Sequence, residues 1–177
     1  MIPDMTLKPV LEQEHTHFAG KEHCRYIPTY LMYLLDMAAA YVYVRFPGLQ
    51  DRRLWIGNGQ SLQNECPGHD AHTGFAVDIN YYTQNIELPE IPNATHYPAG
   101  GNLAQIWDGD VFLSEKFHFD ANYMLFRILR ELGITKYRTS ELLRKEFAQR
   151  RYDITGMVAD FNFNYNHHLH AHVEFTI

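Results

Sequence analysis

The chain has 177 residues, of which 46% are hydrophobic and 14% aromatic, which is enough for one domain with a sizeable core. Its net charge of -6 at pH 7 and the lack of a long Lys/Arg run exclude the basic surface expected of a nucleic-acid-binding protein, so no nucleic-acid partner is predicted. No internal repeat or linker-like shift in composition interrupts the chain, and we therefore predict a single domain over residues 1–177.

The N-terminal half indicates neither an export signal nor a membrane span. Residues 1–17 lack the basic and apolar regions of a signal peptide. The longest apolar tract, residues 29–44, is shorter than a bilayer-spanning helix and contains Asp36, which favours a buried helix instead. The two cysteines, Cys24 and Cys66, fit either an extracellular disulfide or a pair of reduced core thiols.

The first predicted elements are a helix over residues 28–45, with Pro28 in its first turn, and a short strand over residues 52–57. A loop rich in Gly, Asn, Ser and Pro follows and carries His69 and His72. Side chains then alternate over residues 75–82, which predicts a strand with Asp78 on its polar face, pointing away from the core.

Residues 84–109 are rich in Pro, Asn and Gly without periodicity, which predicts a long surface loop that walls a cleft. Asp120 is the predicted N-cap of a helix that ends at Gly133. A strand over residues 134–139 and a helix over residues 140–150 come next. The fold class predicted from this order is α+β, with flanking helices and a small antiparallel sheet.

The C-terminal residues alternate again and predict a last strand. Ala171 and Val173 point inward, whereas His168, His170, His172 and Glu174 point outward. Glu174 could hydrogen-bond a metal ligand from this face, but as an exposed strand residue it needs no role, and we expect the latter. A hydrolytic zinc site needs about three protein ligands and an open position for water, and histidine with a carboxylate is a familiar ligand set. His72, Asp78 and one of these histidines can supply it, with His170 placed to handle protons or to stabilise an oxyanion.

Two segments carry a resemblance to a known family. GHDAHTGFAVDI, residues 68–79, resembles the zinc motif of the penicillin-insensitive murein endopeptidases, which share a fold group with D-Ala-D-Ala peptidases, lysostaphin-type enzymes and the hedgehog domain. HHLHAHV, residues 167–173, matches that family's H-x-x-H-x-H-V pattern. The resemblance covers roughly residues 52–177, and residues 1–51, a predicted N-terminal helical part, lie outside it.

The resemblance implies that His72, Asp78 and His172 bind zinc and that His167 and His170 are active-site histidines. His69 is then a pocket residue or the alternative ligand, because the spacing from His72 to Asp78 is one residue shorter than in the family. The implied protein is a zinc metallopeptidase that hydrolyses a peptide bond in peptidoglycan crosslinks or stem peptides. Its site of action would be the periplasm or the cell exterior, reached as a mature periplasmic form, a phage lysin or an exported toxin.

Two alternatives remain open. A non-catalytic zinc-binding module of the same fold would keep the ligands without turnover, although a structural zinc site normally has four closed ligands. A non-haem Fe(II) oxygenase is the second, because His118 and Asp120 form an H-x-D pair with histidines about fifty residues downstream. No Arg follows those histidines to hold an oxo-acid, which argues against the oxygenase. The sequence leaves the oligomeric state open.

Overall fold

The computed structural model describes residues 6–10, 13–18, 24–49, 53–59, 66, 75–84, 107–108, 111–112, 114–160 and 170–175. Its strands are β1 (Leu7–Pro9), β2 (Thr16–Phe18), β3 (Tyr26–Pro28), β4 (Leu54–Ile56), β5 (Phe75–Asn80), β6 (Trp107–Asp108), β7 (Val111–Phe112), β8 (Ile134–Ser140), β9 (Met157–Asp160) and β10 (His170–Phe175). Its helices are α1 (Thr29–Arg45), α3 (Phe119–Glu131), α4 (Glu141–Gln149) and the short 3-10 helix η3 (Ser114–Lys116). The fold is α+β, as predicted.

One six-stranded sheet, in the order β2-β4-β5-β10-β8-β9, organises the molecule. The prediction of an antiparallel sheet holds for the central strands and is wrong at both edges, where β2 pairs with β4 and β8 with β9 in parallel. Each parallel pair is separated in sequence by a helix, α1 in the first case and α4 in the second. Parallel neighbours require such a crossover, which explains the mixed edges.

Helix α1 confirms the predicted helix over residues 28–45. It begins directly after Pro28, whose φ of -58° suits a helix entry, and it buries Leu31, Leu35, Ala38 and Val42. Asp36 is tolerated within this apolar helix because its Oδ1 accepts hydrogen bonds from the His15 backbone N–H at 3.0 Å and the Thr16 hydroxyl at 3.3 Å. Within the described ranges, no helix is both long and apolar enough to cross a bilayer.

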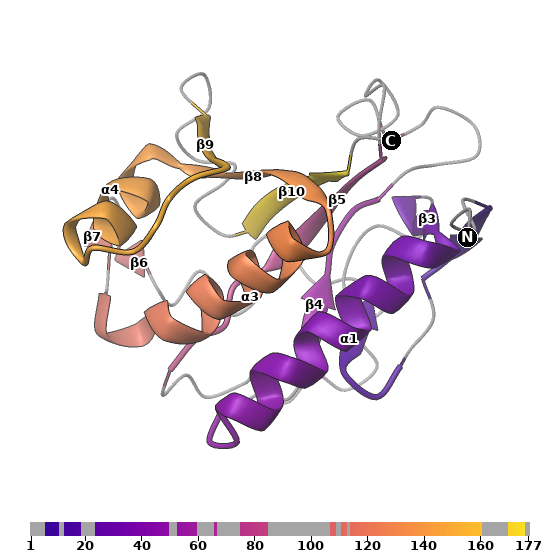
Figure 1. Ribbon diagram of the computed structural model, residues 1–177, viewed down its shortest axis with the longest axis horizontal. Helices are drawn as coiled ribbons and strands as arrows, with labels where there is room; N and C mark the ends of the chain where they lie inside the picture. Colours follow the sequence, from indigo (N-terminus) through magenta and orange to yellow (C-terminus); the bar gives the residue numbers. More distant parts are fainter. Residues whose placement is uncertain are drawn as a thin grey trace.

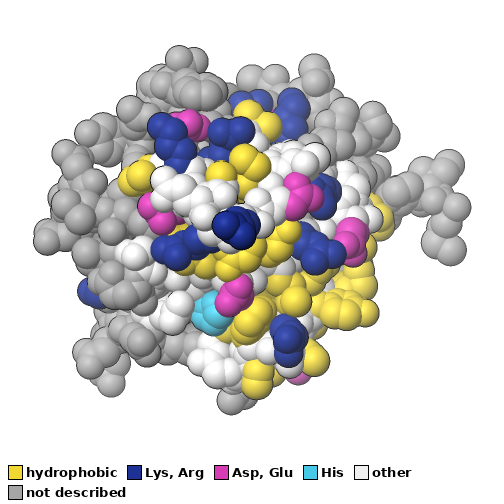
Figure 2. Space-filling model, turned by 60° about the vertical axis from the view of Figure 1, so that its left-hand side comes forward, with side chains coloured by type: hydrophobic (Ala, Val, Ile, Leu, Met, Phe, Trp, Pro, Cys, Tyr) yellow, Lys and Arg dark blue, Asp and Glu magenta, His cyan; other side chains and the backbone are white. Residues whose placement is uncertain are grey.

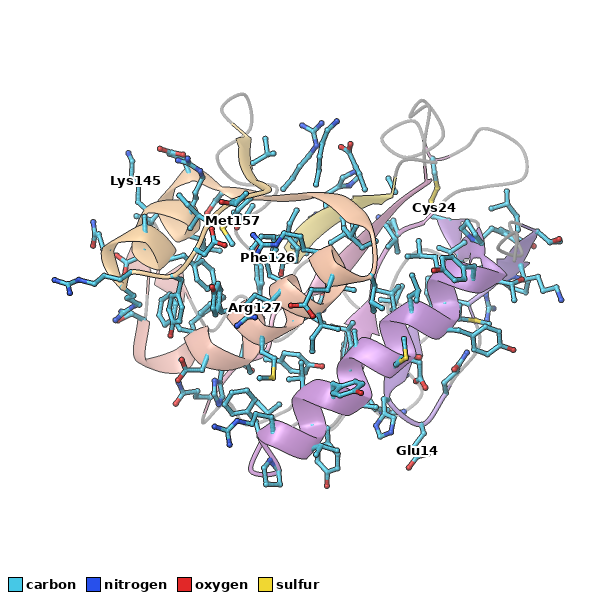
Figure 3. All side chains as sticks on the ribbon, in the orientation of Figure 1. Glu14, Cys24, Phe126, Arg127, Lys145 and Met157 are labelled. Carbon is cyan, nitrogen blue, oxygen red and sulfur yellow. A yellow bond between two sulfur atoms is a disulfide. The ribbon has the colours of Figure 1, made fainter. Side chains whose placement is uncertain are left out.

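Helix α3 lies beside α1, and the two cover the same face of the sheet (Figure 1). Leu125 and Leu129 are fully buried, and Phe126 extends between α3 and the strands behind it (Figure 3). Gly133 follows the helix with a φ of +98°, which an L side chain rarely adopts. The predicted N-cap was wrong: His118 caps the helix, accepting from the Ala121 N–H through Nδ1.

Helix α4 confirms the last predicted helix, and its N-cap is Ser140, whose hydroxyl accepts from the Leu143 N–H. The predicted loop over residues 84–109 lies mostly outside the described residues. Its end is a strand instead, since β6 pairs with β7. The N-terminal part, predicted to be helical, also contains strands. β1, β2 and β3 precede α1, and β2 forms one edge of the main sheet.

The sheet divides into an apolar face and a polar face along its central strands. Val77 and Ile79 of β5 and Ala171 and Val173 of β10 are fully buried in one core cluster with side chains of α1 and α3. Because successive side chains of a strand point to opposite faces, the intervening residues of β5 and β10 face away from the helices. That second face carries the candidate site.

Candidate metal centre

The register of β5 and β10 brings predicted site residues together across the sheet. The strands run antiparallel with His172 directly opposite Asp78. His172 Nδ1 lies 3.1 Å from Asp78 Oδ1, and both side chains are buried. Residues 94 positions apart in the sequence thus meet because both lie at outward positions of alternating strands.

His170 approaches the same carboxylate from the neighbouring outward position of β10. Its Nε2 lies 3.5 Å from Asp78 Oδ1, and its side chain is 27% exposed, against 7% for His172. The predicted alternation of β10 is therefore confirmed over its described residues. His170 is the more accessible imidazole of the pair, which suits a residue that contacts a substrate.

Asp78 and His172 carry a carboxylate and an imidazole, two donor types that zinc binds. Zinc binds histidine nitrogen and carboxylate oxygen at about 2.0–2.2 Å, so two donors of a tetrahedral ion lie about 3.3–3.6 Å apart. The separation of 3.1 Å between His172 Nδ1 and Asp78 Oδ1 is slightly shorter and is that of a hydrogen bond between the two side chains. Within the described part of the chain, however, no group of three or more His, Cys, Asp or Glu side chains is arranged to hold a metal ion.

Three of the predicted site residues, His69, His72 and His167, lie outside the described residues, as does His168. The structure thus brings together Asp78, His170 and His172. The expected third ligand, His72 or its alternative His69, remains a prediction from the sequence.

The backbone of Asp78 is fixed on both sides by the segment that follows β4. The Gly57 N–H donates to the Asp78 carbonyl at 2.7 Å, and the Asp78 N–H donates to the Asn58 carbonyl at 2.8 Å. A Cβ on Gly57 would lie 2.9 Å from the Asp78 Cβ, so this close approach requires glycine. Sequence reasoning missed Gly57.

Glu174 corrects the expectation of an exposed residue without a role. It is 7% exposed, and it accepts hydrogen bonds from Arg138 Nε and from Lys136 Nζ, the latter at 3.0 Å. Burial raises the pKa of Glu174, but the hydrogen bonds from these two cations outweigh burial and hold the pKa below its ordinary value. The sequence did contain one sign of this pairing, because the alternation of β8 puts Lys136 and Arg138 on the same face of that strand.

A pocket of about 390 Å³ opens at the N-terminal end of α3 and is lined partly by His118, Asp120 and Tyr152. The Tyr152 hydroxyl donates to Asp120 Oδ1 at 2.5 Å, and burial together with this bond raises the pKa of Tyr152 to about 12. Burial lowers the pKa of His118, whose Nδ1 caps the helix. His118 and Asp120, the pair on which the Fe(II) oxygenase alternative depends, are therefore both hydrogen-bonded within the protein, His118 to the start of α3 and Asp120 to Tyr152.

The surface near α4 carries both signs of charge. Figure 2, in which the left-hand side of Figure 1 comes forward, shows Lys and Arg side chains interspersed with Asp and Glu. Ion pairs among the described residues of α3, α4 and the segment after α4 include Arg130 with Asp153 at 3.0 Å and Arg150 with Glu146 at 3.4 Å. Such exposed pairs contribute little to stability, about 0–1 kcal/mol each.

The two cysteines form a disulfide, which decides between the two possibilities that the sequence left open. Cys24 and Cys66 are 42 residues apart, with their Cα atoms 5.9 Å from each other. Figure 3 places Cys24 beside β3. The Cys24 carbonyl also accepts from the Gly59 N–H at 2.6 Å, so the disulfide lies next to the segment that holds Asp78.

The sequence matches no protein-family model, and a search of curated proteins finds no match.

Proposed function

We propose that this protein is a zinc-dependent peptidoglycan hydrolase with the fold of the hedgehog and D-Ala-D-Ala peptidase group. The observation that carries the proposal is the convergence of His172 Nδ1 and His170 Nε2 on Asp78 Oδ1, at 3.1 and 3.5 Å. These are three of the residues that the family motif assigns to the metal and to catalysis. Their proximity on one face of the sheet supports the proposal.

Asp78 and His172 would hold the zinc ion, with His72, or His69 in its place, as the third ligand. When bound, zinc lowers the pKa of its water towards about 7 and polarises a carbonyl group. His170 is accessible beside the ligand pair, so its imidazole can accept a proton from the attacking water, return it to the leaving amine, or donate a hydrogen bond to the oxyanion. His167 is assigned a similar role by the motif alone.

The substrate class rests on the resemblance of residues 68–79 and 167–173 to the murein endopeptidases. The scissile bond would be a peptide bond in a crosslink or stem peptide. The disulfide between Cys24 and Cys66 agrees with action in the periplasm or outside the cell, because disulfides persist in oxidising compartments.

The test is release of soluble muropeptides from purified peptidoglycan by the zinc-loaded protein, with and without a chelator. We expect release that the chelator abolishes and added zinc restores. His170→Ala should bind zinc with unchanged stoichiometry and lose turnover. Loss of zinc from this variant would make His170 a ligand, contrary to the proposed assignment. Absence of release on every crosslink type, with zinc bound, would overturn the hydrolase and favour the non-catalytic zinc module.

A further inference from the structure

The pocket of about 390 Å³ at the N-terminal end of α3 is a second candidate site. Three segments line it: the start of α3 with Asp120, the end of α4 with Arg150, and the segment after β5 with Gln84. Phe117 and Phe119, both buried, supply the apolar part of the lining. A pocket of this size that combines an apolar part with a few charged and polar groups suits a small polar ligand.

Arg150 gives the pocket a positive charge in a fixed orientation. Its guanidinium carbon lies 4.0 Å from the centre of the Phe119 ring, where the aromatic face attracts the cation. Its ion-pair partner among the described residues is Glu146, 3.4 Å away on the exposed side of α4, and such a pair holds the guanidinium only weakly. A planar guanidinium with unused N–H donors is well suited to bind a carboxylate.

The turn that ends α4 brings Tyr152 to the same pocket as Arg150. The Tyr152 N–H donates to the Phe147 carbonyl at 3.1 Å, and the Arg151 N–H donates to the Ala148 carbonyl at 2.9 Å. Arg151 between them has a φ of +64°, the left-handed conformation in which this type of helix end usually has glycine. Arg150 and Tyr152, the residues on either side of it, therefore both line the pocket.

Asp120 gives the pocket the opposite charge. The Tyr152 hydroxyl donates to its Oδ1 at 2.5 Å, and Oδ2 accepts from no described residue. The pKa of Tyr152, raised mainly by burial, is also raised by Asp120 and lowered by Arg150, so both charges lie near this hydroxyl. Asp120 and Arg150 nevertheless form no ion pair with each other in the described structure. Each charge is left to interact with a ligand.

His118 adds a neutral hydrogen-bond donor to the lining. Its Nδ1 accepts from the Ala121 N–H at 3.3 Å, so the neutral ring carries its proton on Nε2. The formal charges of the described lining residues then cancel. A ligand with only a negative charge would be repelled by Asp120, and one with only a positive charge would be repelled by Arg150. A ligand that carries both charges is attracted by both residues.

We propose that this pocket binds a small zwitterion, a free amino acid or a dipeptide, with its carboxylate at Arg150 and its ammonium group at Asp120. The two kinds of ligand share both charged groups and differ in the distance between them. The inference does not rest on the proposed function, because Asp78, His170 and His172 are not among the residues that line the pocket.

The test is titration calorimetry of the full chain with the common amino acids, as separate L and D enantiomers, and with dialanine. We expect at least one of these probes to bind and to shift the Asp120 and Arg150 amide signals in 1H–15N spectra. The N-acetyl derivative of the tightest probe lacks the ammonium group, and its carboxamide lacks the carboxylate. Each should bind at least about tenfold more weakly, the factor for losing a hydrogen bond between charged groups.

Two variants should reverse this preference in opposite directions. Asp120→Asn keeps an oxygen for the Tyr152 hydroxyl but loses the charge, so it should bind the zwitterion more weakly and the N-acetyl derivative more tightly than the wild-type protein. Arg150→Gln should weaken the zwitterion and favour the carboxamide. General damage to the pocket would weaken all ligands alike. The matched control is Arg144→Gln, which removes an arginine of similar exposure, paired with Glu141 on α4, and should change no affinity.

The inference is overturned if no probe binds at millimolar concentration, or if the shifted signals lie away from the pocket. It is also overturned if the wild-type protein binds the zwitterion and its two derivatives equally. Circular dichroism establishes that each variant is folded. If a variant does not fold, the comparison of the three ligands on the wild-type protein still decides the outcome. The ratio of alanine to dialanine affinity then assigns the length of the ligand.

Discussion

Gly57→Ala should weaken zinc binding at the proposed site although it replaces none of the proposed ligands. The new Cβ would lie 2.9 Å from the Asp78 Cβ, whereas ordinary van der Waals contact begins at 3.4 Å. Asp78 must therefore shift by about half an ångström, which exceeds the roughly 0.2 Å over which metal–ligand distances vary. Such overpacking costs about 1–3 kcal/mol of folding stability. Because zinc binding requires Asp78 to return to its original place, this cost opposes binding, and we expect zinc affinity to fall about 5- to 140-fold.

Two other glycines provide matched controls for this variant. At Gly59 a Cβ would meet Ile27 Cγ2 at 2.6 Å and the Tyr26 carbonyl oxygen at 2.7 Å, so Gly59→Ala should destabilise the fold with little effect on zinc affinity. At Gly48 a Cβ would meet nothing within 4 Å, so Gly48→Ala should change neither quantity. The measurements are thermal unfolding and chelator competition on all three variants. Equal zinc affinity in Gly57→Ala and Gly48→Ala, or equal losses in Gly57→Ala and Gly59→Ala, would refute the reasoning.

Three further predictions concern the scaffold. Because burial lowers the folded-state pKa of His118, the helix cap is intact above the unfolded pKa near 6.5 and is lost as pH falls through the folded pKa. His118→Asn keeps a capping side chain without an ionisable ring, so it should flatten the slope of Tm against pH in this range, and an unchanged slope would contradict the prediction. Asn122→Ala removes the hydrogen bond that the buried amide accepts from the Tyr82 N–H and those that it donates to the Tyr82 and His118 carbonyls. It should cost about 3 kcal/mol in urea unfolding, and a loss under about 1 kcal/mol would argue against that network. Replacing both Cys24 and Cys66 by Ser should destabilise the oxidised protein by about 4 kcal/mol, the closure entropy of a 42-residue loop, and by little under reducing conditions.

The elements that could be predicted from sequence are those with a strong local signal. Alternation predicted the polar face of β10, and its pairing with β5 then placed His172 opposite Asp78. Helical spacing and Gly133 predicted that α3 exists and roughly where it lies, although the predicted N-cap was two residues too late. In these segments the local pattern and the tertiary packing favour the same structure, so nothing overrides the pattern.

The features that could not be predicted depend on contacts between distant segments. Glu174 is an unremarkable outward strand residue in the sequence, and only the pairing of β10 with β8 brings Lys136 and Arg138 to it. Gly57 matters because Asp78 lies against it, which no local pattern reveals. The cap of α3 is a similar case, since Asp120 is a better N-cap by propensity but bonds Tyr152, and His118 caps the helix instead.

The central claim is that Asp78 and His172 bind zinc on the polar face of β5 and β10. Anomalous diffraction at the zinc edge, from crystals of the zinc-loaded protein, tests it most directly. We predict one strong peak about 2.0–2.2 Å from both Asp78 Oδ1 and His172 Nδ1, with His72 or His69 as the third ligand. A zinc-loaded crystal with no peak at this pair, or with its zinc bound elsewhere, would contradict the account.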